Sequence, residues 1–217
     1  SLHVTGGLPE LEINRSAVQM GVKLIVIGSH GQNYLTELVL GGTASAVLHQ
    51  ASLPVLLIRL AGAVGDESDR SGQGLFRHVL FATDFSDNSE RAFAYVQEIA
   101  GRTGCAVTLM HVQDRSRLER HLAGRLDEFN RIDMARLGNM KDALGEASDS
   151  EVHVMLPYGS PVQEILRCTR EQRVSLVVMG SQGRGFVGEA FLGSVSHKVA
   201  RHAHTHVLLI PPAGKAR

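Results

Sequence analysis

The sequence predicts an α/β protein with an open parallel sheet of five strands and helices on both faces. Three observations support this prediction. Short apolar runs alternate with longer segments whose apolar residues recur at helical spacing. Part of this pattern occurs twice in the chain. The composition, with 43% hydrophobic and 20% charged residues among 217, is that of a globular chain long enough to bury a substantial core.

The repeat is visible without any gap. When the chain is shifted by 152 positions, residues 7–58 fall on residues 159–210, and 20 of the 52 pairs are identical. LIVIGSHG (24–31) matches LVVMGSQG (176–183), and VLLI (55–58) matches VLLI (207–210). We therefore expect two copies of one structural unit.

The second copy contains every element of the predicted unit, in residues 76–213. Its strands alternate with helices, which is typical of a parallel sheet covered on both faces. Ser86 or Asp87 is expected to cap the first helix, and Ser160-Pro161 to open a later one. In order, the expected elements are a strand in 77–86, a helix from 86 or 87, a strand at 105–112, a helix at 116–146, a strand at 151–159, a helix from 160, a strand at 175–180, a helix after 193 and a strand at 206–211.

The first copy, residues 1–60, holds only the part of the unit that begins at the third strand. We expect three strands there, and a linker over 61–75 because that segment is rich in glycine, serine and charge. Its first two strands would precede Ser1, so the sequence is expected to be an incomplete tandem protein. The two VLLI strands are expected to dock against each other.

Glycines follow the strand at 175–180 in an uneven pattern. At the carboxyl end of a parallel strand, such a turn lets backbone N–H groups approach phosphate oxygens, and a following helix N-terminus adds positive charge. Gly180 and Gly183 fit this turn, whereas Gly193, Ser194 and Ser196 fit a second cradle with hydroxyl donors. On spacing alone, glycines that only permit tight turns explain the pattern equally well. No GK[ST] closes the loop, and it does not follow the first strand, so it is neither a Walker A nor a Rossmann loop.

With these motifs, the chain resembles the universal stress protein family. The family's nucleotide-binding members share Gly, two residues, Gly, nine residues, Gly, then Ser or Thr, which Gly180, Gly183, Gly193 and Ser194 match. The resemblance implies strand order 3-2-1-4-5. It also implies that Asp84, in ATDFS, contacts the nucleoside and that Val112, the last residue of LMHV, contacts adenine through its backbone. The phosphates would be held by Gly180, Gly183, Gly193, Ser194 and Ser196, and Val195, between the two serines, is expected to belong to the same cofactor-binding site.

The first copy departs from this pattern. Gly28, Gly31 and Gly41 keep the spacing, but Gly42 replaces the hydroxyl residue and Thr43 comes one position late. The strand that would carry the matching aspartate is absent. We therefore do not expect the first copy to bind nucleotide by itself.

Charge and cysteine content exclude several classes of partner. Lysine plus arginine and aspartate plus glutamate both number 22, which leaves no net field to attract nucleic acid or an acidic membrane. Cys105 and Cys168 show no metal or redox spacing, which fits a reducing compartment. They are expected to be small core residues. No apolar run is long enough to span a bilayer, and a cytoplasmic protein is expected.

The sequence thus predicts a stress-response protein that binds ATP, or AMP or ADP in its place, as a regulatory module rather than an enzyme. Mg²⁺ could accompany the phosphates, although no metal cage is visible. The protein is expected to form a homo-oligomer or to pair its own two copies. Two alternatives remain open. One is a slow ATP hydrolase, for which Arg184 is the candidate catalytic arginine. The other is a dimerisation module without nucleotide.

Overall fold

One sheet of seven strands runs through both copies of the repeat. The computed structural model describes residues 2–29, 40–59, 74–114, 126–184 and 192–213. The predicted linker lies almost wholly outside these ranges. The elements are, in chain order, α1 (Pro9–Gln19), β1 (Ile25–Gly28), α2 (Gly42–Gln50), β2 (Val55–Ile58), β3 (His78–Ala82), α3 (Asp87–Thr103), β4 (Ala106–Met110), β5 (Gln113–Asp114), α5 (Leu126–Ala147), β6 (Val152–Met155), β7 (Tyr158–Gly159), α6 (Pro161–Glu171), β8 (Leu176–Gly180), α7 (Ser194–His202) and β9 (His206–Ile210).

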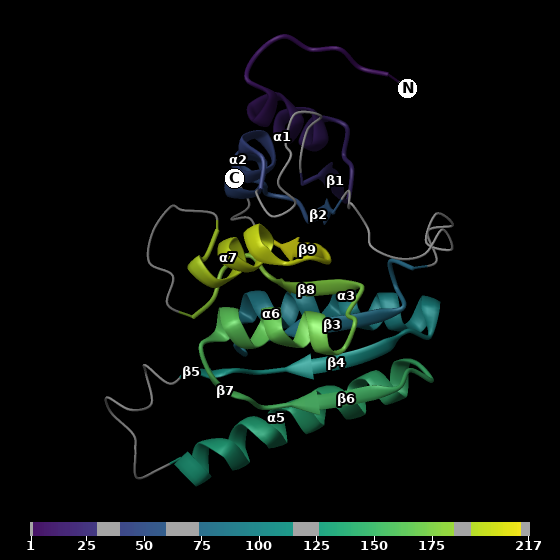
Figure 1. Ribbon diagram of the computed structural model, residues 1–217. Helices are drawn as coiled ribbons and strands as arrows, with labels where there is room; N and C mark the ends of the chain where they lie inside the picture. Colours follow the sequence, from purple (N-terminus) through teal and green to yellow (C-terminus); the bar gives the residue numbers. More distant parts are fainter. Residues whose placement is uncertain (1, 30–39, 60–73, 115–125, 185–191, 214–217) are drawn as a thin grey trace.

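The strand order is β1-β2-β9-β8-β3-β4-β6, and Figure 1 shows this stack from top to bottom. Within the second copy the order is the expected 3-2-1-4-5, with every pair parallel. The copies meet at β2 and β9, which pair antiparallel with Leu56 opposite Leu208. The two VLLI segments therefore dock as expected, and the sheet has seven strands rather than five because the first copy continues it.

In its described residues, 2–29 and 40–59, the first copy contributes two strands, so the prediction of three was wrong. The segment before α1 forms no strand, and Leu2 and Val4 are 92% and 89% exposed. Its counterpart in the second copy, β6, is held in the sheet by pairing with β4. The structure describes no counterpart of β4 beside residues 2–8, and a strand without a ladder partner gains no hydrogen bonds.

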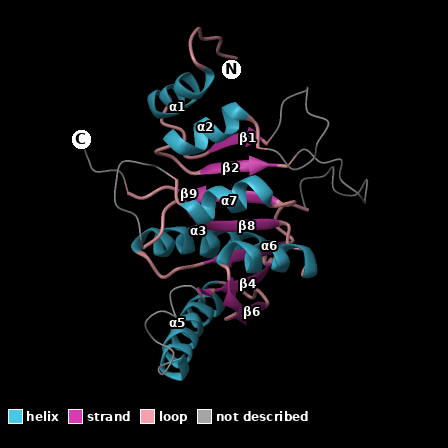
Figure 2. Ribbon diagram, turned by 60° about the vertical axis from the view of Figure 1, so that its left-hand side comes forward, coloured by secondary structure: helices cyan, strands magenta, loops and turns pink. Residues whose placement is uncertain are grey.

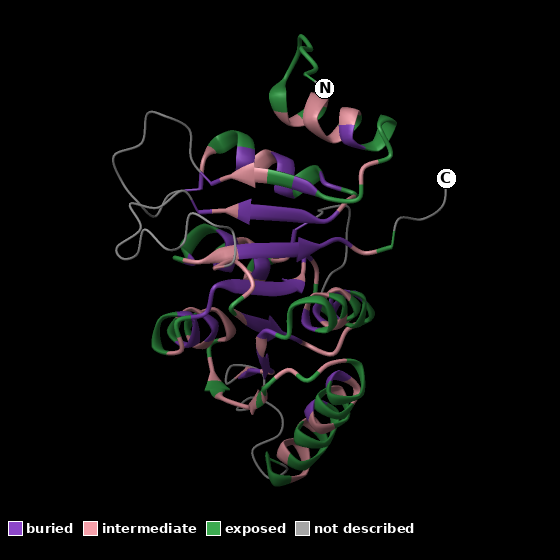
Figure 3. Cartoon of the chain, turned by 90° about the vertical axis from the view of Figure 1, so that its right-hand side faces the viewer, coloured by how far each residue is buried: buried purple, intermediate pink, exposed green. Residues whose placement is uncertain are grey.

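Two apolar layers cover the sheet, as a parallel sheet requires. One layer packs α1, α2, α6 and α7 against side chains such as Leu57, Leu80 and Val177. Figure 2 shows α2, α7 and α6 in a row on this face. The other packs α3 and α5 against Phe81 and Val178. Figure 3 shows buried central strands and exposed outer helix surfaces.

Capping residues and prolines in the sequence predicted where several helices begin. Ser86, rather than Asp87, caps α3, and its hydroxyl accepts a hydrogen bond from the Ser89 N–H. Pro161 opens α6 at its first position. The strand expected over 151–159 is instead divided into β6 and β7, and β7 leaves the main sheet to pair with β5. Of the helix expected over 116–146, residues up to 125 lie outside the described ranges.

Candidate functional site

A cavity of about 410 Å³ opens at the carboxyl ends of β3, β4 and β8. Its size falls within the roughly 300–1,000 Å³ typical of small-molecule sites. In open α/β sheets, ligands bind outside the carboxyl ends of the strands, where the chain direction of the connections changes. The cavity lies at this place, because β3 is flanked on one side by β4 and on the other by β8.

The structure brings all eight residues predicted for the site to this one cavity. They come from the ends of three strands and from the first turn of α7. The cavity lining includes Asp84, Val112, Gly180, Gly183, Gly193, Ser194, Val195 and Ser196. These residues are far apart in the sequence. They come together because β3 pairs in parallel with β4 and β8, so that the carboxyl ends of the three strands lie side by side.

Two of the three motif glycines lie where a Cβ would overlap a neighbouring side chain, and the third has little free space around it. A Cβ at Gly183 would lie 2.5 Å from Asp84 Oδ2, and one at Gly180 would lie 2.8 Å from Asn88 Nδ2. At Gly193 the nearest atom, the Ser181 carbonyl oxygen, would be 3.2 Å away. The turn that holds Gly180 and Gly183 is therefore packed tightly against Asp84 and Asn88, and a Cβ at either glycine would require the neighbouring side chain to shift.

Asp84, just after β3, binds the turn at residues 180–184, which we call the glycine turn. Its Oδ2 accepts a hydrogen bond from the Arg184 N–H at 2.8 Å. Its Oδ1 accepts from the Ser86 N–H and, at 2.6 Å, from the Ser86 hydroxyl. Both oxygens are thus engaged with the protein itself, and Asp84 positions the turn as well as lining the cavity.

The first turn of α7 faces the cavity without a side-chain cap. Gly193, which has no side chain, is the N-cap, so within the part of the chain that the structure describes no side chain caps the first N–H groups of the helix. Ser194 is exposed at this end. Ser196 is different, because it is 2% exposed and its hydroxyl donates to the Ser181 carbonyl oxygen at 2.6 Å. Ser196 therefore holds α7 against the end of β8.

Sequence reasoning did not identify the polar group at the other side of the cavity. His111, Gln113 and Asp133 line it there. The Gln113 Nε2 donates to Asp133 Oδ2 at 3.0 Å, and His111 Nδ1 lies 2.7 Å from the Thr83 carbonyl oxygen. The four-residue spacing of Phe129 and Asp133 places both on one face of α5, but only the packing of α5 brings them to the cavity.

Phe85 was also missed. It has a left-handed backbone, with φ of 57°, which is unusual for a bulky residue. This conformation lets its ring pack on that of His111, with 4.5 Å between centroids. The guanidinium carbons of Arg136 and Arg184 lie 5.2 and 5.8 Å from the centre of the Phe85 ring, within cation–π range. A strained residue beside a cavity is a recurrent mark of a functional site.

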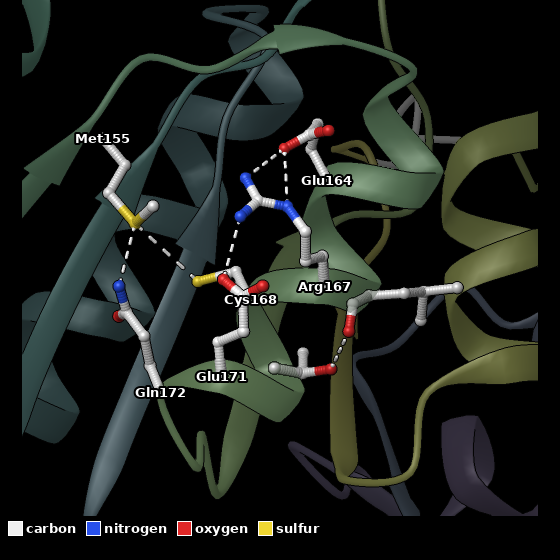
Figure 4. A network of polar contacts seen from close by, with 8 residues as sticks. Met155, Glu164, Arg167, Cys168, Glu171 and Gln172 are labelled. Carbon is white, nitrogen blue, oxygen red and sulfur yellow. Dashed lines mark hydrogen bonds and ion pairs between the residues drawn. The ribbon is translucent and has the colours of Figure 1, made fainter.

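The two cysteines lie outside the cavity lining and are buried. Cys105 is 5% exposed and Cys168 is 1% exposed. Burial raises the pKa of Cys105 and raises that of Cys168 to about 11, so both thiols stay protonated. The Cys168 sulfur, on α6, lies 3.8 Å from Met155 Sδ. Figure 4 shows this contact. The same view shows Arg167 between Glu164 and Glu171 on the outer face of the helix.

The profile of the universal stress protein family matches residues 1–59 and 75–211. The chain belongs to this family. Among curated relatives, a universal stress protein of Mycolicibacterium smegmatis is 29% identical over 191 residues, or 88% of this chain. The chain spans 62% of that relative's length. The universal stress protein YxiE of Bacillus subtilis is 31% identical over 147 residues, which cover 63% of this chain and 99% of the relative.

A solved structure supports the same membership. The universal stress protein of Archaeoglobus fulgidus superposes with a TM-score of 0.69 at 28% identity, covering 95% of this chain and 67% of the other. Within the described ranges, no helix of this family member is both long and apolar enough to cross a membrane. The same ranges contain no group of three or more histidine, cysteine, aspartate or glutamate residues arranged to hold a metal ion.

Proposed function

We propose that this universal stress protein binds an adenine nucleotide, ATP or in its place ADP or AMP, in the cavity beside β3, β4 and β8. The glycine turn and the start of α7 take the phosphates, and the Asp84 and Val112 side takes the nucleoside. Binding fixes the turn and α7 in one arrangement, which partners then recognise. The protein acts as a regulatory module in this proposal.

The uncapped start of α7 carries the proposal. A helix N-terminus bears about half a positive charge, and its free N–H groups can bind phosphate oxygens directly. Gly193 at the N-cap position has no side chain to cap these N–H groups, and the exposed Ser194 adds a hydroxyl. A cavity of about 410 Å³ adjoins it, which leaves room for a small ligand. Mg²⁺ would enter with the phosphates, as it usually does in nucleotide sites.

The test is a calorimetric titration of the full chain with ATP. Replacing Ser194→Gly, which copies Gly42 of the first copy, removes one charge-assisted hydrogen bond and should weaken ATP binding by about ten- to a hundredfold. Thr43→Gly, in the first turn of α2, is the matched control and should leave the affinity unchanged. Equal affinities in all three proteins would show that phosphate does not bind at α7.

Two further measurements on the full chain distinguish nucleotide binding from the two alternative functions. ATP at about 100 times its dissociation constant should raise the free energy of unfolding by about 2.7 kcal/mol. No shift at millimolar ATP would favour the dimerisation module without nucleotide. Release of labelled phosphate from bound ATP, lost in Asp84→Ala, would favour the hydrolase.

A further inference from the structure

The two sides of the cavity differ in their hydrogen-bonding character. The α7 side offers N–H donors, because the first turn of that helix has no cap. The opposite side is formed by His111 from the end of β4, Gln113 from β5 and Asp133 from α5. A carboxylate on this side disfavours phosphate and favours a ligand group that carries N–H donors.

The tautomer of His111 follows from its partner. Its Nδ1 lies 2.7 Å from the carbonyl oxygen of Thr83, and a carbonyl oxygen only accepts, so Nδ1 carries the hydrogen. In the neutral ring, Nε2 is then an acceptor. The Phe85 ring packs on the imidazole and fixes its orientation. Nε2 is directed toward Asp133, at 3.7 Å from Oδ2.

Asp133 is held in place by its neighbour. The Gln113 Nε2 donates to Asp133 Oδ2 at 3.0 Å, and Gln113 is 5% exposed. The side chains of His111 and Asp133 are 15% and 14% exposed. When the His111 ring is neutral, its Nε2 and Asp133 Oδ2 are thus two largely buried hydrogen-bond acceptors that face each other without a hydrogen atom between them. Buried acceptors of this kind are stabilised by a donor placed between them.

We propose that His111 and Asp133 select the base of the bound nucleotide by accepting hydrogen bonds from an exocyclic amino group, such as that at position six of adenine. This assignment rests on the function proposed above. A base with a carbonyl oxygen at the same position would present an acceptor to two acceptors. It would leave buried groups unpaired, which is the condition under which sites discriminate most strongly between analogues.

Inosine triphosphate is the matched probe, because its base differs from adenine by the carbonyl oxygen at position six. The wild-type full chain should bind ATP about ten- to a hundredfold more tightly than inosine triphosphate in calorimetric titrations. Asp133→Asn keeps an oxygen for Gln113 but supplies an amide donor to the cavity. This variant should reduce the ratio of the two affinities by about tenfold or more.

Asp142→Asn, an exposed change on the same helix, is the control and should leave the ratio at its wild-type value. Equal affinity of the wild type for both nucleotides would overturn the assignment, whether or not the variant folds. An unchanged ratio in Asp133→Asn would overturn it while leaving nucleotide binding intact. Failure of the wild type to bind either nucleotide would instead overturn the proposed function, and the assignment with it.

Discussion

Gly183 shows how closely single residues around the cavity are packed. The Arg184 N–H donates to Asp84 Oδ2 at 2.8 Å, and this contact brings the carboxylate to where a Cβ of Gly183 would lie. A glycine turn that only needed conformational freedom would require a positive φ, but Gly183 does not have one. The preference for glycine is therefore one of space, because a Cβ there would force the Asp84 carboxylate to move.

Gly183→Ala should break the hydrogen bond between Arg184 and Asp84. We expect a loss of about 1 kcal/mol in the free energy of unfolding, measured in urea, together with weaker ATP binding. Gly138→Ala is the control, because nothing lies within 4 Å of a Cβ at that helical position. It should raise stability by about 0.5–1 kcal/mol. The same gain in Gly183→Ala would contradict the tight contact.

The sequence identified the site residues that belong to a local motif and missed those that reach the cavity through packing. Gly180, Gly183 and Ser194 were recognisable because their spacing is continuous along one segment. His111 and Asp133 come from β4 and α5, and their approach depends on how α5 lies against the sheet. Their role as ligand contacts, like that of the predicted residues, remains a prediction.

At the level of elements, the seam between β2 and β9 joins the two copies. Leu57 is fully buried on β2 and pairs with Val207, and it belongs to the apolar layer under α2 and α7. The repeat made this seam predictable, because two identical apolar strands at the ends of two units can extend one sheet. The missing third strand was not predictable from pattern alone, because an apolar run forms a strand only where a ladder partner exists.

Leu57→Ala should therefore destabilise the protein by about 2–5 kcal/mol through lost burial and the remaining cavity. Leu24→Ala, just before β1, removes the same atoms from a residue that is 41% exposed and should cost much less. Urea unfolding of both variants provides the comparison. Similar losses in the two would mean that the seam adds little to stability.

On the scale of the whole molecule, two histidines couple stability to pH at separate places. His78, at the start of β3, hydrogen-bonds to the Gln172 carbonyl oxygen at 3.1 Å and lies 2.9 Å from the Thr108 hydroxyl. His197, on α7, packs against His49 of the first copy with 5.1 Å between ring centroids. The apolar layer that includes α2 and α7 spans both copies, so we expect protonation of His197 to affect the packing of both.

Burial lowers the pKa of His78, and electrostatic interaction with His153 and Arg77 lowers it further, whereas the hydrogen bond to the Gln172 carbonyl oxygen and the nearby Glu151 raise it. Burial also lowers the pKa of His197, with further lowering by His49, Arg201, His202 and Lys198. In the unfolded chain both groups titrate near the ordinary value of about 6.5. On acidification the unfolded state therefore binds protons first, and the free energy of unfolding falls.

We expect stability to be constant with respect to these two groups above about pH 7 and to decrease as the pH falls through about 6.5. Unfolding in urea at pH 7.5, 6.5 and 6.0 measures the slope before most carboxylates titrate. The double variant His78→Gln, His197→Gln should flatten the slope, whereas His204→Gln, at an exposed position, should not. A wild-type slope that survives the double change would place the pH dependence in other groups, because only a residue that is less protonated in the fold than in the unfolded chain can produce this sign.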